Sequence, residues 1–422
     1  MTPEIKQRIE QIRRGEVPER YVKTALGLAP ANWKRYTFGD IYTERKEPGD
    51  ENLPLLMVSI HSGVSDGEVD AAELLKQVKR IEDKSQYKKA VSGDLVFNMM
   101  RAWQGAIGTV RTTGMVSPAY IVAEPNDKAY PLFMDYYSRT PQMINQIDRQ
   151  SYGVTDFRKR LYWDSFAPIS CTLPPIEEQQ KIAAILTTQD KVIKLKEKRL
   201  AEKQRQKKYL MQQLLTGKKR LPGFSGAWKN IKLCEVLSER KEKNIEQNLR
   251  ICSVAVQKGV VDQVEHLGRS YAANDTSNYS VAHYGDIIYT KSPTGDFLYG
   301  IVKQNLLQET VAVSPLYGVF TPLTFGLGYF LHTYFQSAIC ARNYLLPIVQ
   351  KGAKNTINIT NDTFISSKLY LPLDVEEQKA IADTFIAADR EIELLRQDIR
   401  QEKQKKKALM QLLLTGIVRV TV

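Results

Sequence analysis

One long stretch occurs twice in this chain, and the repeat limits the folds that the remaining residues can adopt. The first copy runs from Leu173 to Gly217 and the second from Leu371 to Gly416. Corresponding positions lie 199 residues apart, as for Glu177 and Glu376, and from there on neither copy contains an insertion relative to the other. A chain with such a repeat is expected to consist of two related halves.

Each copy has the start and stop signals of a long helix. A proline-containing turn precedes it, and paired glutamates follow where the partial positive charge of a helix N-terminus favours them: Glu177, Glu178, Glu376 and Glu377. Both copies end at a Thr-Gly step, where Gly217 or Gly416 can adopt the left-handed conformation that stops a helix. The sequence therefore predicts two helices of roughly 38 residues, nearly 60 Å long at about 1.5 Å per residue.

The apolar residues of both helices recur at three- and four-residue spacing, which is typical of a coiled coil. This seam contains Ile182, Leu186, Ile193, Leu200, Leu210 and Leu214 in the first copy, and Ile381, Phe385, Ile392, Leu395, Ile399, Leu409 and Leu413 in the second. Polar residues interrupt it at Gln189, Lys196, Lys203, Lys207, Glu402 and Lys406, and we expect them to fix the register or to need a partner. The alternative is a pair of helices that pack only on their own domains, and the two matched copies disfavour it.

Each helix follows a globular block, and the two blocks share sequence landmarks. Trp33 precedes Glu44-Arg45-Lys46 by the same interval that separates Trp228 from Glu239-Arg240-Lys241. Further matched pairs are Gly93-Asp94 with Gly285-Asp286, Ser117-Pro118 with Ser314-Pro315, and Asp164-Ser165-Phe166 with Asp362-Thr363-Phe364. Short β-rich runs between turn residues predict an antiparallel or mixed sheet with a few helices in each block.

These observations predict an α+β chain with two pseudo-symmetric domains separated by two long helices. We expect an N-terminal helical segment at residues 1–30, a globular domain at 31–172, a central spacer helix at 173–217, a second globular domain at 218–370 and a C-terminal spacer helix at 371–422.

The charge of the chain restricts its partners. A formal net charge of +13 favours a polyanionic partner, although a merely basic surface is the alternative.

No apolar run reaches the roughly 18 residues of a membrane span, and the N-terminus lacks an apolar signal core, so a cytoplasmic protein is expected. The four cysteines and four histidines show no metal-ligand spacing, which favours buried thiols.

Known catalytic motifs are missing from the sequence. It has no GxxxxGK[ST] phosphate loop. Leu173-Pro174-Pro175-Ile176 lacks both the amide or carboxylate and the aromatic ring of the tetrad with which amino-methyltransferases bind a flipped adenine. No persuasive nuclease constellation or nucleophile elbow is present. We therefore expect the chain to perform no catalysis itself.

Two α+β blocks, each followed by a helix that begins near LPxxEEQ and closes near LMQxLLTG, resemble the specificity subunit of type I DNA restriction-modification systems. The most specific segments are 173–186, 371–385, 207–217 and 406–416. The resemblance implies two target-recognition domains that each read half of a split double-stranded DNA site, and two helices that pair antiparallel as a spacer. It also implies two methyltransferase subunits and restriction-translocase subunits as partners, which would use S-adenosylmethionine, ATP and Mg; no cofactor is expected on this chain.

The two blocks diverge in the loop that follows the Gly-Asp strand, where a DNA reader should diverge. For base contacts we expect Arg101 and Gln104 in the first block, because Arg can bind guanine and Gln can bind adenine in the major groove, and Lys291, Ser292 and Thr294 in the second. Phosphate contacts are expected from Lys88, Lys89, Arg158, Lys159, Arg160, Lys351 and Lys354. Solvated surface charge is the alternative for each of these residues.

The leading turns of the two helices are the expected docking sites for methyltransferase subunits, with Ile176, Ile182, Leu186, Val375, Ile381 and Phe385 as contact residues. The second hypothesis is a duplicated coiled-coil scaffold or RNA-binding protein without restriction partners. A methyltransferase or nuclease acting by itself is disfavoured by the missing motifs.

Overall fold

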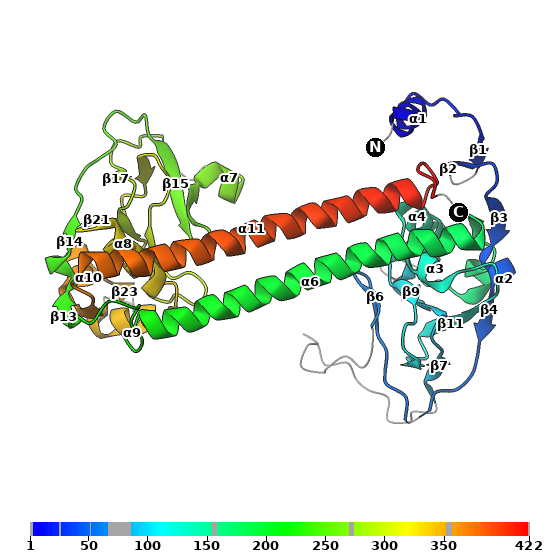
Figure 1. Cartoon of the computed structure of the whole chain (residues 1–422), viewed down its shortest axis with the longest axis horizontal. Helices are drawn as coiled ribbons and strands as arrows, with labels where there is room; N and C mark the ends of the chain where they lie inside the picture. The colour runs from blue at the N-terminus through cyan, green and yellow to red at the C-terminus, as the bar shows by residue number, and fades with distance from the viewer. Residues whose placement is uncertain are drawn as a thin grey trace. The chain divides into compact units, whose positions relative to one another are not determined.

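The computed structural model describes residues 3–24, 27–50, 52–65, 86–153, 158–269, 274–351 and 357–420. The chain divides into two compact units: unit 1 contains Met1–Lys196 and Asp398–Val422, and unit 2 contains Glu197–Gln397. Each of the two long helices, α6 (Ile176–Leu214) and α11 (Val375–Leu413), therefore contributes one segment to each unit (Figure 1). The finer domain boundaries expected from the sequence stay a prediction.

Unit 1 has an α+β fold, in which helices pack on short antiparallel strands. Its strands are β1 (Tyr21–Thr24), β2 (Gly27–Pro30), β3 (Lys34–Thr37), β4 (Tyr42–Arg45), β5 (Val58–Ser59), β6 (Gly63–Val64), β7 (Lys88–Ala90), β8 (Leu95–Asn98), β9 (Ile107–Thr109), β10 (Gly114–Val116), β11 (Tyr120–Pro125) and β12 (Ser170–Leu173). Its helices, besides its part of the long ones, are α1 (Pro3–Arg13), α2 (Phe38–Ile41), η3 (Ala102–Gln104), α3 (Pro131–Tyr137), α4 (Pro141–Gln150) and α5 (Trp163–Phe166).

Unit 2 repeats this plan. Its strands are β13 (Lys229–Lys232), β14 (Leu237–Glu239), β15 (Arg250–Ala255), β16 (Gly259–Asp262), β17 (Ser280–Ala282), β18 (Ile287–Tyr289), β19 (Val302–Gln304), β20 (Val311–Val313), β21 (Gly318–Pro322), β22 (Gln350–Lys351), β23 (Ile357–Asn358) and β24 (Lys368–Leu371). Its shorter helices are η5 (Leu233–Glu235), α7 (Gln263–Leu267), α8 (Phe325–Tyr334), α9 (Ala338–Leu345), η6 (Leu346–Ile348) and α10 (Asn361–Ser366).

The central sheets of the two units have the same topology. The strand order is β4-β11-β8-β9 in unit 1 and β14-β21-β18-β19 in unit 2, and all neighbours in both sheets are antiparallel. In unit 2 a second sheet, β16-β15-β20-β17, contains one parallel pair, β15 with β20. These sheets confirm the predicted α+β fold and its internal pseudo-symmetry.

The repeated sequence landmarks form equivalent parts of the two cores. Phe166 is completely buried and its ring centroid lies 4.6 Å from that of Phe97; Phe364 is equally buried and lies 4.5 Å from Tyr289. The Asp-Ser/Thr-Phe motif therefore supplies a buried phenylalanine that packs against the central sheet of each unit. Such buried ring pairs are stabilising through both their area and their geometry.

Within each unit the two long helices pack antiparallel. In unit 1, Ile182 and Leu186 near the start of α6 share a core with Leu413 and Leu414 at the end of α11. In unit 2, the end of α6 (Leu214) shares a core with the start of α11 (Ile381–Phe385). Since the start of one helix meets the end of the other in both units, the predicted antiparallel pair is confirmed.

The polar residues of the predicted seam bind across the helix pair. In unit 1, Gln189 Nε2 donates to Glu402 Oε2 at 2.6 Å, and Lys196 Nζ lies 2.8 Å from a carboxylate oxygen of Glu402 and from one of Asp398. In unit 2, Lys203 Nζ lies 2.9 Å from Glu391 Oε2. The seam therefore needs no other chain to satisfy these groups, and the pairs fix its register.

Two further ion pairs between the long helices occupy equivalent positions of the repeat. Lys207 pairs with Asp389 at 2.5 Å in unit 2, and Lys406 pairs with Asp190 at 2.6 Å in unit 1. A tyrosine of a shorter helix donates a hydrogen bond to each of these aspartates. The Tyr329 hydroxyl lies 3.0 Å from Asp389 Oδ2 in unit 2, and the Tyr136 hydroxyl lies 2.7 Å from Asp190 Oδ2 in unit 1. The long helices are thereby tied to the globular part of each unit.

The second glutamate of each helix start is buried in a polar cluster. In the Glu178 cluster of unit 1, Glu178 accepts hydrogen bonds from Arg419 Nε at 2.7 Å and from Trp33 Nε1 at 3.3 Å. The equivalent Glu377 cluster of unit 2 joins Glu377 to Arg220 and to Trp228. Each arginine follows the glycine that ends the opposite helix, and Gly217 and Gly416 have the predicted left-handed φ of 68° and 71°.

None of the helices in the described residues combines the length and the apolar character that a membrane crossing requires. The same residues contain no group of three or more His, Cys, Asp or Glu side chains that could hold a metal ion. Cys171 and Cys252 are buried free thiols as predicted, whereas Cys234 is exposed.

Candidate nucleic-acid interface

In unit 1, the loop after β8 presents the two residues predicted to contact bases. Arg101 directly precedes η3 and Gln104 ends it, and both side chains are exposed. Gly105 closes the turn with a φ of 103°, a conformation that glycine adopts without strain. Asn98 and Trp103 fix the loop from inside, because Asn98 Oδ1 accepts the N–H of residue 100 at 2.9 Å and Trp103 Nε1 donates to the carbonyl of that residue at 3.0 Å.

A second segment of unit 1 lies against this loop. The backbone N–H of Leu161 donates to the carbonyl of Met99 at 2.8 Å, and Tyr152 and Arg160 pair through two backbone hydrogen bonds of 3.1 and 2.8 Å. Arg158 and Arg160 are exposed. We call Asn98–Gly105, Tyr152 and Arg158–Leu161 the unit 1 loop surface. The fold thus brings Arg101 and Gln104 together with two predicted phosphate contacts that are distant in sequence.

Lys159 connects the two segments of the unit 1 loop surface. Its Nζ lies 2.9 Å from Asp148 Oδ1 and 5.6 Å from the centroid of the Trp103 ring. An ammonium engaged by a carboxylate and an indole face is less available to a phosphate than an exposed one. Lys159 therefore supports the loop, and its predicted phosphate contact stays a prediction.

The lysines of β7 also have partners within unit 1. Lys88 Nζ donates to the carbonyl of Tyr120 at 2.8 Å, and burial lowers the pKa of Lys88. Lys89 Nζ lies 3.0 Å from Glu47 Oε2. Both contacts stabilise the edge of the domain, so the structure gives these lysines a role besides the predicted binding of phosphate.

In unit 2, the residues predicted to contact bases lie in the loop between β18 and β19, and we call Thr290–Gly300 the unit 2 loop surface. Ser292 and Thr294 are exposed, and Lys291 is half-buried with a left-handed φ of 60°. Burial lowers the pKa of Lys291, although Glu239 opposes this effect. A side chain at Gly300 would lie 2.8 Å from the backbone nitrogen of Lys291, so glycine there permits the close turn. Lys351 lies in β22, and Lys354 lies outside the described residues.

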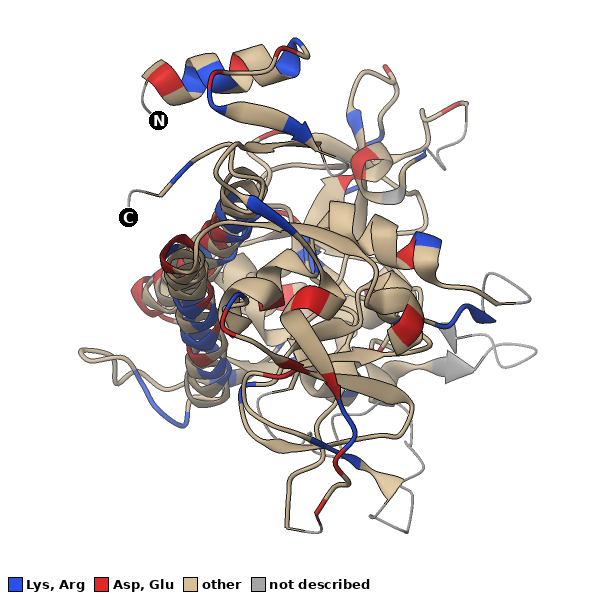
Figure 2. Cartoon of the chain, turned by 90° about the vertical axis from the view of Figure 1, so that its right-hand side faces the viewer, with Lys and Arg blue, Asp and Glu red and all other residues tan. Residues whose placement is uncertain are grey.

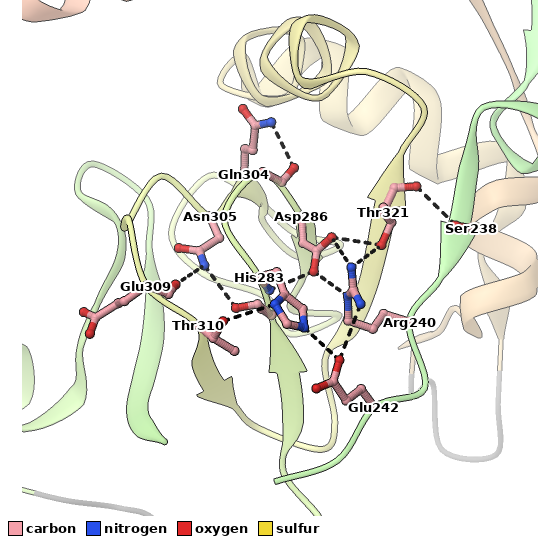
Figure 3. Close-up of polar contacts among 12 residues, drawn as sticks. Ser238, Arg240, Glu242, His283, Asp286, Gln304, Asn305, Glu309, Thr310 and Thr321 are labelled. Carbon is pink, nitrogen blue, oxygen red and sulfur yellow. Dashed lines mark hydrogen bonds and ion pairs between the residues drawn. The ribbon is translucent and has the colours of Figure 1, made fainter. Parts of the chain in front are cut away.

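The repeated Glu-Arg-Lys and Gly-Asp motifs meet in a polar network that sequence reasoning did not assign. In unit 2 (Figure 3), Arg240 Nε donates to Asp286 Oδ2 at 2.6 Å, and His283 bridges Glu242 at 2.8 Å and Thr310 at 3.1 Å. The unit 1 counterpart pairs Arg45 with Asp94 at 2.8 Å and Glu47 with Lys89. Asp94 and Asp286 are each 2% exposed, so the Arg45–Asp94 and Arg240–Asp286 pairs are structural and the two aspartates are not free to contact a ligand.

The residues predicted to dock partners divide into two groups. Ile182, Leu186, Ile381 and Phe385 are at most 1% exposed and belong to the cores of their own units, which corrects their placement on a docking surface: their side chains pack inward. Ile176 is half-buried and Val375 is 52% exposed. Tyr370 and Leu373, which precede α11, are 44% and 46% exposed, so an apolar surface does accompany that helix start.

The two units thus present unlike loop surfaces on equivalent sheets, and within each unit the long helices pack antiparallel. The family model described as type I restriction modification DNA specificity domain matches residues 71–205 and 208–403, more than half of the chain. The chain therefore belongs to this family, and the resemblance noted in its sequence is confirmed.

Individual relatives agree with this assignment. The chain is 24% identical to the type I restriction enzyme MjaVIII specificity subunit of Methanocaldococcus jannaschii over 371 residues, which covers 80% of this chain and 83% of that protein. It is 22% identical to the putative MjaX specificity subunit of the same organism, with 95% and 97% coverage. A crystal structure of a type I restriction-modification S subunit from M. genitalium shares the fold, with a TM-score of 0.53, 11% identity, and coverage of 93% of this chain and 97% of that one.

Proposed function

We propose that this chain is the DNA specificity subunit of a type I restriction-modification complex, in which unit 1 and unit 2 each read one half of a split, asymmetric site. The observation that carries the proposal is the contrast between equivalent scaffolds and unlike loops. The central sheets share one strand order, yet one presents Arg101 and Gln104 and the other Lys291, Ser292 and Thr294. Two different readers on one plan fit a site whose halves differ. The formal charge of +13 suits double-stranded DNA.

We further propose that the chemistry belongs to partner subunits: two methyltransferase subunits and restriction-translocase subunits, which would use S-adenosylmethionine, ATP and Mg. The exposed apolar residues at the start of α11, including Leu373 and Val375, support a docking site there. The test is co-purification of the full chain with its methyltransferase partner, followed by sequencing of the DNA that the complex modifies. Modified adenine within one split sequence supports the proposal. Methylation by the isolated chain, or a preference for RNA over duplex DNA, would overturn it.

The proposal predicts that Arg101 contributes to one half-site only. Arg101→Ala removes an exposed guanidinium that can bind guanine, so discrimination at one half-site should fall by about 10- to 100-fold while the other half-site is unaffected. The measurement compares the methylation rate of the intact site with that of sites carrying one base substitution, placed in either half-site in turn. Arg35→Ala is the matched control, because Arg35 lies in β3 and donates to Ser170. Loss of folding, or equal losses at both halves, would contradict a base contact.

The helix pair is proposed to set the gap between the half-sites. Lys203 and Glu391 face each other, so one heptad inserted directly after Lys203 and another directly before Glu391 keep the seam in register. Seven residues add about 10 Å, and at about 3.4 Å per base pair the gap should lengthen by about three base pairs. Sequencing of the modified DNA measures the gap, and an unchanged gap in a folded, active variant excludes the spacer role.

A further inference from the structure

Two large apolar side chains are exposed in the unit 1 loop surface. In the described part of residues 31–175, the exposed large apolar side chains are Met100 and Tyr152, at 46% and 59%. Single exposed apolar residues are ordinary on protein surfaces. Here, however, both belong to the two segments that also expose Arg101, Arg158 and Arg160. Both positive and negative residues occur on the long helices (Figure 2), where ion pairs such as Lys196–Glu402 and Lys203–Glu391 engage some of the lysines.

The backbone of Met100 is held rigidly although its side chain is exposed. Its N–H donates to Asn98 Oδ1 at 2.9 Å, and its carbonyl accepts from Trp103 Nε1 at 3.0 Å. The preceding residue, Met99, is fixed at both polar groups by Ala119 and Leu161, at 3.1 and 2.8 Å. A side chain presented on so constrained a backbone loses little backbone entropy when it binds a partner.

The equivalent loop of unit 2 also presents an apolar side chain. Leu298 is 52% exposed, and the neighbouring Phe297 is buried and pairs with Thr294 through two backbone hydrogen bonds of 3.0 Å. The hydrogen bonds that hold this loop differ from those of unit 1, yet each loop exposes one apolar side chain. Both loop surfaces therefore combine a basic residue, a hydrogen-bonding side chain and an exposed apolar group.

This combination matches the chemistry of the major groove. Arginine and glutamine bind base edges through hydrogen bonds, whereas thymine differs from the other bases by a 5-methyl group that apolar side chains contact. A methionine is well suited to such a contact because its side chain is long, unbranched and polarisable. We propose that Met100 contacts the 5-methyl group of a thymine in the half-site that unit 1 reads, an inference that rests on the proposed DNA-reading function.

The surroundings of Met100 favour DNA over a protein as the partner of this side chain. A protein-docking surface has an apolar centre of many residues, whereas Met100 lies beside the exposed Arg101 and Gln104. Cations around a small apolar group suit a base edge flanked by phosphates. The geometry therefore assigns Met100 to sequence reading.

The test replaces each thymine of the mapped site in turn by deoxyuridine, which removes the methyl group alone. The full chain, purified with its methyltransferase partner, should bind at least one such substitution in a single half-site about three- to five-fold more weakly, as expected for one buried methyl. The Met100→Ala variant should bind DNA with thymine and DNA with deoxyuridine at that position equally tightly. The Met100→Leu variant should again bind the thymine-containing DNA more tightly. Leu298→Ala is the matched control and should leave this ratio unchanged.

The proposal fails if Met100→Ala keeps the full thymine-to-deoxyuridine ratio, if no substitution weakens binding by the wild-type protein, or if the half-site contains no thymine. It also fails if Met100→Ala weakens both DNAs equally, which would make the residue a general contact. Specific binding of the unsubstituted site is measured in the same experiment. Its presence preserves the proposed function even when the methyl contact is absent, and its absence overturns that function.

Discussion

Glu178→Gln is expected to destabilise unit 1 by about 2–3 kcal/mol. The carboxylate is 0% exposed and accepts two hydrogen bonds of 2.7 Å from Arg419 as well as the indole N–H of Trp33. Removing one partner of a buried ion pair typically costs about 3–5 kcal/mol, and the lower value expected here reflects the partial exposure of Arg419. Urea unfolding followed by circular dichroism measures the change.

The adjacent residue provides a matched control for this prediction. Glu177 is exposed in the same helical turn, so Glu177→Gln removes the same charge from the helix N-terminus without breaking the Glu178 cluster. That interaction is worth less than about 1 kcal/mol. The fluorescence emission of Trp33 should shift in the Glu178→Gln variant, and that of Trp228 should shift in the Glu377→Gln variant. Equal losses of stability in the Glu177 and Glu178 variants would show that the cluster has no special role.

Lys303→Met is expected to stabilise unit 2 at pH 7. Lys303 lies in β19 with 3% exposure, and burial lowers its pKa to about 8, with Lys207 acting in the same direction and Asp389 in the opposite one. An unfolded lysine titrates near 10.5, so the folded protein bears on the order of 3 kcal/mol of destabilisation while Lys303 is protonated. Methionine fills similar volume without the charge.

The sign of the pH dependence follows from these two pKa values. Between about pH 8 and 10.5 the unfolded chain binds the lysine proton and the folded chain does not, so stability rises with pH in this window. Below pH 8 the destabilisation is fully present. Lys303→Met should remove the rise measured by thermal unfolding from pH 7 to 9.5. The neighbouring His332 has a pKa lowered by burial and titrates outside this range.

Lys368 is the control for the lysine prediction, because it is an exposed lysine of the same unit. Lys368→Met should change neither the stability at pH 7 nor its pH dependence. If Lys303→Met were less stable than the wild type at pH 7, or kept the same slope with pH, the buried lysine would instead be a stabilising element of unit 2.

Local sequence patterns were sufficient to predict the long helices. Proline turns, paired glutamates and terminal glycines act within a few residues, and the seam from Ile182 to Ile193 is buried as its spacing indicated. The matched motifs likewise predicted equivalent folds. In both cases the physical cause is short-range or repeated in the chain, so one sequence contains enough information.

Contacts between distant residues could not be predicted in the same way. Trp33, Glu178 and Arg419 meet only in the folded unit, and nothing local distinguishes Glu178 from Glu177. The same limit applies to the candidate site. Arg101 and Gln104 were predicted as base contacts from the divergence of the loops. The support that Lys159 gives and the exposure of Met100 could not be predicted in this way, because they depend on tertiary packing.

The discontinuity of unit 1 has a consequence for the order of folding during synthesis. Unit 2 is one continuous segment, Glu197–Gln397, whereas unit 1 needs Asp398–Val422 to complete it. Leu413 and Leu414 belong to the core of unit 1, and Arg419 neutralises its buried Glu178. A ribosome therefore releases every residue of unit 2 before the last part of unit 1 emerges. Although most of unit 1 is translated first, its folding cannot be completed until Asp398–Val422 has been translated.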